Sequence, residues 1–170
     1  MNNLKKIALI IPLLASVIFF SYTIFQKSKI NNVVFSTING QEISMRSLRG
    51  KVVLVSFWAT DCKSCVKEMP DLIKTYQQYQ PKGLEIIAIA MPYDPPAQVV
   101  NYVTQKQVPF PVMHDSYAEM TEKFGGVSLT PTAYIYNKKG KRIQRAIGAL
   151  NFTKLFLLLL LKYIVDLLMV

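Results

Sequence analysis

Two runs in the chain are apolar at nearly every position, from Val52 to Phe57 and from Leu84 to Met91. Strands that are covered on both faces are apolar at nearly every position, so both runs predict buried β-strands. Upstream, Val33 to Met45 alternates in short stretches around Asn39-Gly40. An Asn-Gly pair between alternating runs is typical of a β-hairpin. The sequence therefore predicts a hairpin followed by the strands of a covered sheet.

Further elements alternate with these strands. Helices are predicted at about Cys62–Gln80, Pro95–Gln107, Ser116–Phe124 and from Asn151 onward. Pro70 should kink the first of these helices. Strands are predicted at Phe110–Met113, Thr132–Asn137 and Arg142–Ile147. The order is βαβ, then α, then ββα. This order predicts an α/β fold with a central mixed β-sheet and helices on both faces.

A separate apolar segment lies at the N-terminus. The run from Ile7 to Phe25 carries no charge and is flanked by lysines. A helix needs about 20 apolar residues to cross a bilayer core. Signal peptides end in small residues, whereas this run ends in bulky ones, so we expect an uncleaved transmembrane anchor. The expected division is an anchor and short basic linker over residues 1–30 and one domain over 31–170.

Charge excludes some functions and leaves others open. The net charge is +10, but no nucleic-acid-binding motif accompanies it, so nucleic acid is not an expected partner. The last predicted helix contains the leucine-rich stretch from Leu155 to Leu161. Its wide apolar face predicts a helix that covers the sheet, with a dimer or membrane-surface contact as the alternative.

The strongest candidate for chemistry is the pair Cys62 and Cys65, the only cysteines in the chain. They follow the first apolar strand directly, where a helix is predicted to begin. Residues three apart on a helix share one face, so a disulfide can join them. A helix N-terminus also favours the thiolate of the first cysteine. Reversible dithiol–disulfide chemistry is thus predicted, with a zinc site or a plain structural disulfide as the alternatives.

The run Phe57 to Pro70, with Trp58-Ala59-Thr60 leading into the cysteine pair and Glu68-Met69-Pro70 after it, resembles the thioredoxin superfamily. Within it, the run is most similar to the membrane-anchored TlpA/ResA-like thiol–disulfide oxidoreductases. A second match, Gly126 to Ile135, resembles the loop that carries a cis-proline facing the cysteines. The resemblance implies a thioredoxin-like fold and no cofactor other than a redox-active Cys62–Cys65 disulfide.

The resemblance also implies roles for individual residues. Cys62 matches the exposed nucleophile and Cys65 the resolving thiol. Glu68 matches a buried acid that handles the second thiol's proton. Pro131 matches a cis-proline that holds the substrate backbone beside the sulfurs and blocks metal capture, and Thr130 before it also lies at the substrate. Trp58 matches an aromatic residue that covers the site, with ordinary core packing as the alternative.

Asp61 departs from this pattern, because the family has an uncharged residue directly before the first cysteine. A carboxylate there should disfavour the thiolate of Cys62 and modulate its reactivity. His114, the single histidine, leaves an alternative function open. Copper-delivery proteins of related fold combine two cysteines with a distant histidine, so Cys62, Cys65 and His114 could form a copper-binding or metallochaperone module.

The resemblance implies partners and a location as well. The expected substrates are protein disulfides, for example in cytochrome c maturation, and the expected electron donor is a membrane-embedded thiol protein. Ile7–Phe25 would hold the protein in the lipid bilayer of the cytoplasmic membrane as a single-pass anchor. The lysine and arginine distribution does not decide orientation. An N-terminal span that acts as a secretion signal places the domain on the periplasmic or extracytoplasmic side, where dithiols meet disulfide-forming substrates.

Overall fold

A computed structural model describes Ser16 and residues 32–152 of the chain. The elements, in order, are β1 Val34–Ser36, β2 Glu42–Ser44, β3 Val52–Trp58, α2 Lys63–Tyr79, the 3-10 turn η1 Gln80–Lys82, β4 Leu84–Ala90, α3 Pro96–Gln105, β5 Val112–His114, α4 Glu119–Lys123, β6 Thr132–Tyr136 and β7 Arg142–Ile147. Apart from Ser16, the predicted anchor Ile7–Phe25 lies outside the described residues, and so does nearly all of the last predicted helix. Within the described part, no helix is both long and apolar enough to cross a membrane.

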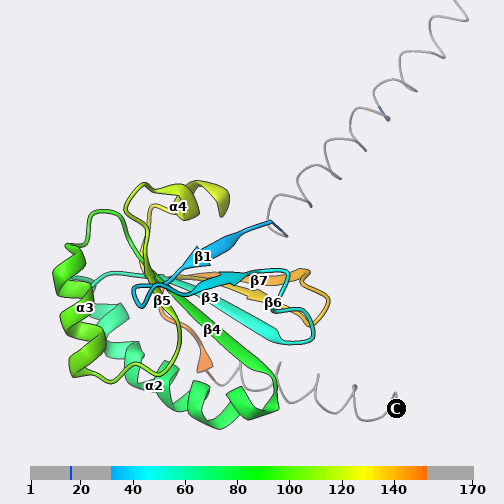
Figure 1. Ribbon diagram of the computed structural model, residues 1–170, viewed down its shortest axis with the longest axis horizontal. Coiled ribbons are helices and arrows are strands. Elements are labelled where there is room, and N and C mark those ends of the chain that lie inside the picture. The colour runs from blue at the N-terminus through cyan, green and yellow to red at the C-terminus, as the bar shows by residue number, and fades with distance from the viewer. Residues whose placement is uncertain (1–15, 17–31, 153–170) are drawn as a thin grey trace, which may run out of the picture.

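Five strands form the central sheet, in the order β5-β4-β3-β6-β7. Strands β3, β4 and β5 run parallel, whereas β6 pairs antiparallel with both β3 and β7. The sheet is therefore mixed, as predicted (Figure 1). Because β3 lies in the middle, its carboxyl end is bordered by the end of β4 on one side and by the start of β6 on the other. The chain leads from this carboxyl end directly to the two cysteines.

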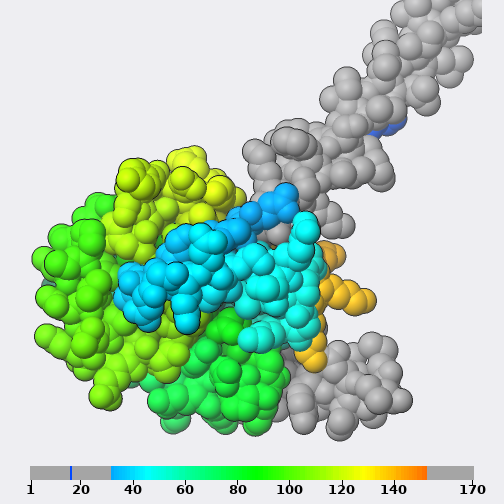
Figure 2. Space-filling model, viewed as in Figure 1, coloured from blue at the N-terminus to red at the C-terminus, as the bar shows by residue number. Residues whose placement is uncertain are grey.

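Each face of the sheet has its own apolar layer. On one face, α2 and α3 contribute Met69, Leu72 and Val99 to a core with Leu54 and Ile86 of the sheet. The other face is covered by the β1–β2 hairpin and α4, which contribute Phe35, Met120 and Phe124. Every residue of β3 and β4 is buried, in keeping with strands covered on both faces. Figure 2 shows the hairpin on the surface of the domain beside the α4 region.

Two predicted boundaries shift for local reasons. Helix α4 begins at Glu119 rather than Ser116, because Ala118 has a positive φ of 57° and the buried Asp115 carboxylate caps the helix at Met120 and Thr121. Strand β5 begins at Val112 rather than Phe110, directly after a proline that has no N–H to give to a ladder. The α2 helix continues through Pro70 to Tyr79.

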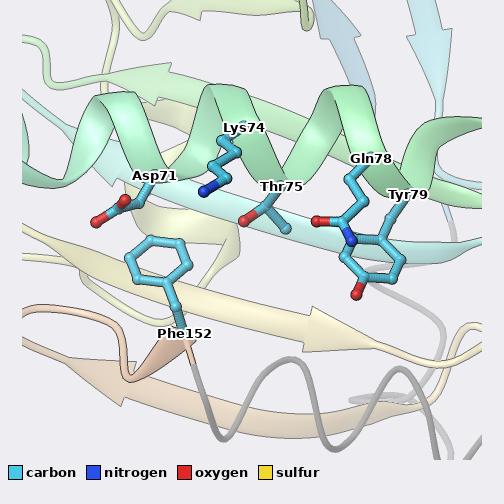
Figure 3. Close-up of a pocket in the computed structure, with 6 residues that line it drawn as sticks. All are labelled: Asp71, Lys74, Thr75, Gln78, Tyr79 and Phe152. Carbon is cyan, nitrogen blue, oxygen red and sulfur yellow. The ribbon is translucent and has the colours of Figure 1, made fainter.

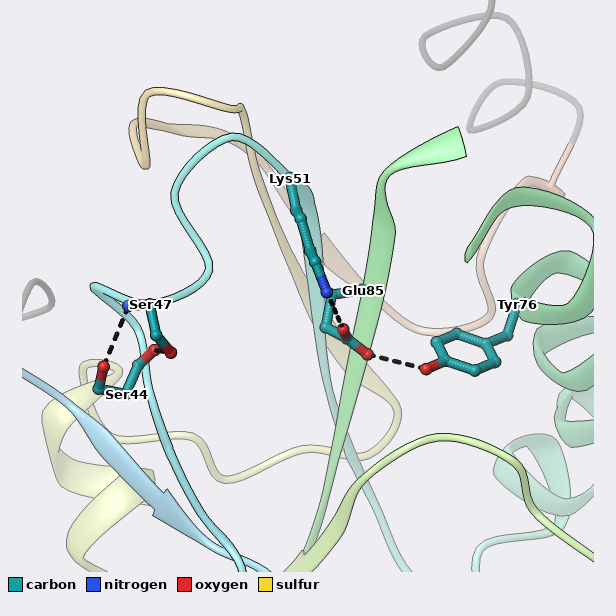
Figure 4. A network of polar contacts seen from close by, with 5 residues as sticks. All are labelled: Ser44, Ser47, Lys51, Tyr76 and Glu85. Atoms are coloured by element: carbon teal, nitrogen blue, oxygen red, sulfur yellow. Dashed lines mark hydrogen bonds and ion pairs between the residues drawn. The ribbon is translucent and has the colours of Figure 1, made fainter. Parts of the chain in front are cut away.

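A polar network closes the sheet at the end opposite the cysteines. The Lys51 ammonium lies 2.8 Å from Oε2 of Glu85, and the Tyr76 hydroxyl donates to the other carboxylate oxygen at 3.0 Å (Figure 4). Burial and the neighbouring Glu85 carboxylate raise the pKa of Tyr76 to about 12. The network joins the starts of β3 and β4 to the last turns of α2, and so fixes the helix that carries the cysteines.

Candidate active site

The cysteine pair occupies the junction between β3 and α2. Cys62 is the N-cap of α2, and its sulfur accepts a hydrogen bond from the backbone N–H of Cys65 at 3.2 Å. A disulfide joins the two residues, with 5.2 Å between their Cα atoms. Cys62 is partly exposed, whereas only 1% of Cys65 is accessible. A substrate can therefore reach Cys62, whereas Cys65 is shielded.

Glu68 lies on α2 one turn beyond Cys65 and is buried, as the resemblance implied. Its Oε2 accepts a hydrogen bond from the backbone N–H of Leu150 at 3.0 Å. Burial raises the pKa of Glu68, since it penalises the carboxylate, while the Leu150 N–H opposes the rise and the nearby Asp71 charge adds to it. The Glu68 carboxyl group therefore keeps its proton to a higher pH than an exposed glutamate does.

The loop before β6 flanks the junction from the other side. The Thr130–Pro131 peptide bond is cis, as expected. Pro131 is buried and Thr130 partly so. The register pairs Thr132 with Phe57, so the preceding Thr130 and Pro131 lie beside the end of β3. The structure thus brings this loop and the cysteine segment to the same end of the sheet.

Trp58 is buried in the core beside the cysteine segment. It is the last residue of β3, its side chain is almost fully buried, and its ring lies 5.2 Å from that of Tyr102. It belongs to the same apolar cluster as Cys65. This burial favours core packing, the second of the two roles that the sequence left open for Trp58. Asp61, in contrast, is exposed directly before Cys62.

His114 is held by hydrogen bonds within the protein. Its Nε2 lies 2.6 Å from the carbonyl oxygen of Asp94, and its Nδ1 lies 2.8 Å from Oγ of Ser116. Both ring nitrogens are therefore engaged and neither is directed at the cysteines. Among the described residues, no three His, Cys, Asp or Glu side chains cluster as metal ligands would. The copper alternative gains no support from this geometry.

Asp94 is a site residue that the sequence reasoning missed. Its buried carboxylate accepts hydrogen bonds from the backbone N–H of Thr60 at 2.6 Å and from the Thr60 hydroxyl at 2.5 Å. Thr60 is two residues before Cys62. The available signal was position, because Asp94 follows β4, and the carboxyl ends of neighbouring parallel strands meet at one edge of a sheet. Leu150 gave no such signal, since only its backbone acts.

Two grooves on the described surface lie away from the cysteines. One runs along α2 and is lined by Asp71, Lys74, Thr75, Gln78, Tyr79 and Phe152 (Figure 3). The other lies between β1, β5 and the start of α4 and includes Val34, His114 and Tyr117. Neither groove is lined by a cysteine. The disulfide is thus presented at the end of the sheet and not within these grooves.

The fold and the disulfide at the start of α2 define a member of the thioredoxin superfamily. Residues 27–144 match the AhpC/TSA family, and the chain belongs to that family. Thiol-disulfide oxidoreductase ResA of Bacillus thuringiensis subsp. konkukian is 38% identical over 117 residues, which are 69% of this chain and 66% of that protein. ResA of Bacillus subtilis is 31% identical over 129 residues, 76% of this chain and 71% of that one. The chain thus spans just under two thirds of the first relative.

Solved structures agree on the fold. A thiol:disulfide interchange protein of the thioredoxin family from Chlorobium tepidum has a TM-score of 0.65 and 26% identity, over 71% of this chain and 85% of that one. StoA from Bacillus subtilis has a TM-score of 0.63 over 72% and 92% of the two chains. Its identity is 24%, so it supports the fold alone.

Proposed function

We propose that this protein is a membrane-tethered, extracytoplasmic thiol–disulfide oxidoreductase that reduces protein disulfides with Cys62 and Cys65. The observation that carries the proposal is the disulfide at the N-terminus of α2, with Cys62 accessible and Cys65 buried. A dithiol needs one accessible sulfur to attack and one shielded sulfur to resolve. The membership of the family and its ResA relatives support the same activity.

In the first step, the thiolate of Cys62 attacks one sulfur of the substrate disulfide. The substrate S–S bond breaks, a mixed disulfide forms, and the departing substrate sulfur takes a proton to become a thiol. The Cys65 N–H points at the Cys62 sulfur, at 3.2 Å. In the reduced protein this N–H and the start of α2 stabilise negative charge on that sulfur.

In the second step, Cys65 loses its proton and attacks the Cys62 sulfur. The mixed disulfide breaks, the second substrate thiol leaves, and the Cys62–Cys65 disulfide forms, so two electrons have passed to the substrate. Glu68, one turn from Cys65 and with a raised pKa, is the proposed acceptor of the Cys65 proton. Thr130 and Pro131 are the proposed contacts for the substrate backbone, and the dithiol needs no further cofactor.

The tether and the partners extend this proposal. Residues 1–30 would form the anchor, with Ile7–Phe25 in the lipid bilayer, and 31–170 the thioredoxin-like domain on the periplasmic or extracytoplasmic side. A membrane-embedded thiol protein would return electrons to the disulfide. The resemblance to the TlpA/ResA-like group supports this arrangement and points to cytochrome c maturation as one pathway that such a reductant supplies.

The reduction potential tests the direction of electron flow. The full chain in detergent is equilibrated with mixtures of reduced and oxidised dithiothreitol, and its free thiols are counted by alkylation. A reductant should equilibrate near the value of thioredoxin, about −270 mV, whereas an oxidant would lie near about −120 mV. A value at the oxidising end would overturn the reducing role. Membrane extraction, with accessibility of Cys62 to an impermeant thiol reagent in intact cells, tests the tether and its orientation.

A further inference from the structure

A basic surface lies at the end of the sheet opposite the cysteines. Strand β6 runs antiparallel to β3 and ends at Tyr136, which pairs with Val53 near the start of β3. The turn between β6 and β7 carries several lysines, and the loop that leads into β3 carries two arginines. The cations of this loop and turn, which we call the basic end, are Arg46, Arg49, Lys138, Lys139, Lys141 and Arg142.

Tertiary contacts bring the loop and the turn together. The backbone N–H of Gly50 donates a hydrogen bond to the carbonyl oxygen of Lys138 at 2.9 Å. The Arg49 guanidinium packs against Gly140, where the absence of a Cβ leaves room for it. Figure 2 shows the cyan loop and the orange β6–β7 segment next to each other at the edge of the domain. Two groups of cations that are far apart in the sequence therefore share one surface.

The charges of the basic end are not neutralised by the described acidic residues. The ion pairs in the described part of the chain involve Lys51 and Lys123, which do not belong to the basic end. No described carboxylate pairs with its exposed members Arg46, Lys139, Lys141 and Arg142. Cations that gather on one surface without acidic partners repel one another and attract anions. The basic end thus has the charge of a binding surface for an anionic ligand.

The chain enters the domain at this same surface. The side-chain oxygen of Asn32 accepts a hydrogen bond from the Arg46 guanidinium at 3.3 Å. The predicted anchor ends at Phe25, seven residues before Asn32. A chain extends by at most about 3.6 Å per residue, so Asn32 can lie no more than about 25 Å from the end of the anchor. In the tethered protein, the basic end is therefore the part of the domain that the anchor holds near the bilayer.

We propose that the basic end binds the anionic lipid headgroups of the membrane that holds the anchor. This inference rests on the tether in the proposed function. Basic residues next to a membrane span are attracted to anionic lipids within about a Debye length of the surface. Because Cys62 lies at the other end of β3, the contact directs it away from the bilayer and toward extracytoplasmic substrates. Reduction of the disulfide by a membrane-embedded partner then requires this contact to be released.

Modification of lysines in nanodiscs tests the contact. The full chain is incorporated into discs of phosphatidylcholine, either alone or mixed with phosphatidylglycerol, and is treated briefly with an uncharged amine-acetylating reagent. Mass spectrometry then gives the rate at each lysine. We expect Lys139 and Lys141 to react about fivefold more slowly in the anionic discs. Lys67, an exposed lysine in the first turns of α2, should react equally in both. Salt at about 1 M should remove the difference, because it shortens the Debye length to about 3 Å.

Variants that keep the measured lysines separate charge from other effects. Arg46→Gln with Arg142→Gln should reduce the protection of Lys139 and Lys141 to about twofold or less, since two of the attracting charges are lost. Arg46→Lys with Arg142→Lys keeps both charges and should keep the protection. Lys63→Gln with Lys74→Gln, which removes two exposed cations of α2, is the matched control and should also keep it.

Equal rates at Lys139 and Lys141 in the two kinds of disc would overturn the lipid contact, and so would protection that persists in high salt. Protection by soluble polyglutamate but not by phosphatidylglycerol would overturn it as well, in favour of an acidic polypeptide as the ligand. A chain that cannot be incorporated into either kind of disc would refute the tether, and with it the lipid contact. The proposed reduction of disulfides is measured separately and does not depend on these rates.

Discussion

The backbone N–H of Leu150 donates a hydrogen bond to Oε2 of Glu68 at 3.0 Å, although 82 residues separate the two in the chain. The contact joins the segment after β7 to the helix turn below Cys65. Burial disfavours the Glu68 carboxylate, and this N–H favours it. The position of the chain after β7 therefore helps to set the pKa of Glu68.

The free energy of unfolding of Glu68→Gln should rise relative to that of the wild-type protein as the pH increases from acid to neutral. The pKa of Glu68 is raised above its ordinary value of 4.5. As the pH rises from 4.5 through the raised pKa, the native state retains a proton that the unfolded chain has lost, so the free energy of unfolding of the wild type falls. Glutamine does not titrate and can still accept the Leu150 N–H.

Urea unfolding of both proteins, from below pH 4.5 to above neutrality, measures this difference. Glu122→Gln, at an exposed acid of α4, is the control and should not change with pH in the same way. A wild type that gains stability over Glu68→Gln in this window would contradict the pKa direction.

In the same variant, the step that resolves the mixed disulfide should slow by about 10²-fold if Glu68 accepts the proton.

Cys62→Ser should abolish the reduction of disulfides, while Cys65→Ser should accumulate mixed disulfides with substrate. The reason is the difference in accessibility, since Cys62 is partly exposed and Cys65 is buried. Non-reducing electrophoresis and mass spectrometry of the trapped species provide the measurement. Faster alkylation of Cys65 than of Cys62 in the reduced wild-type protein would show that the two roles are reversed.

Asp61→Asn should raise the rate at which Cys62 reacts with iodoacetamide below neutral pH. Asp61 is exposed beside Cys62, and its negative charge opposes formation of the thiolate. Solvent screens exposed charges, so we expect an increase of about two- to fivefold. The exposed Glu122→Gln serves again as the control for the loss of one negative charge. Superimposable rate–pH curves for Asp61→Asn and wild type would restrict Asp61 to substrate choice or to no role.

Tyr76→Phe should lower the free energy of unfolding by about 1–2 kcal/mol, because it removes a hydrogen bond to the Glu85 carboxylate. Tyr117→Phe is the matched control, as its hydroxyl is on a side chain that is 88% exposed, and it should change stability by less than about 0.5 kcal/mol. The difference in free energy of unfolding between the wild type and Tyr76→Phe should shrink as the pH rises from 10 to about 12, since in this range Tyr76 keeps its proton in the native state and loses it in the unfolded state. An advantage that grows over this range would contradict the raised pKa.

Local signals in the sequence predicted the elements that surround the site. The two runs that are apolar at nearly every position indicated β3 and β4, because a strand covered on both faces shows no regular alternation. The spacing of Cys62 and Cys65 after such a run predicted a disulfide at a helix N-terminus, and the structure has one there. Boundaries were less accurate where an unusual φ or a proline acts, as at Ala118 before α4 and at Pro111 before β5.

Burial and pairing between distant segments were decided only by the tertiary structure. Whether Trp58 covers the site or packs in the core could not be read from its position, because packing depends on partners such as Tyr102 of α3, which is remote in sequence from β3. The engagement of the His114 Nε2 likewise depends on where the loop with Asp94 comes to lie.

The sequence by itself determined the class of chemistry, since the cysteine spacing and the adjoining strand and helix are local properties of the chain. The surroundings of that chemistry were set by contacts between segments that are remote in sequence. Leu150 meets Glu68 through a backbone N–H that every residue except proline has, so no side-chain pattern marks it. Tyr93 meets Thr130 only because the sheet places β4 and β6 on either side of β3.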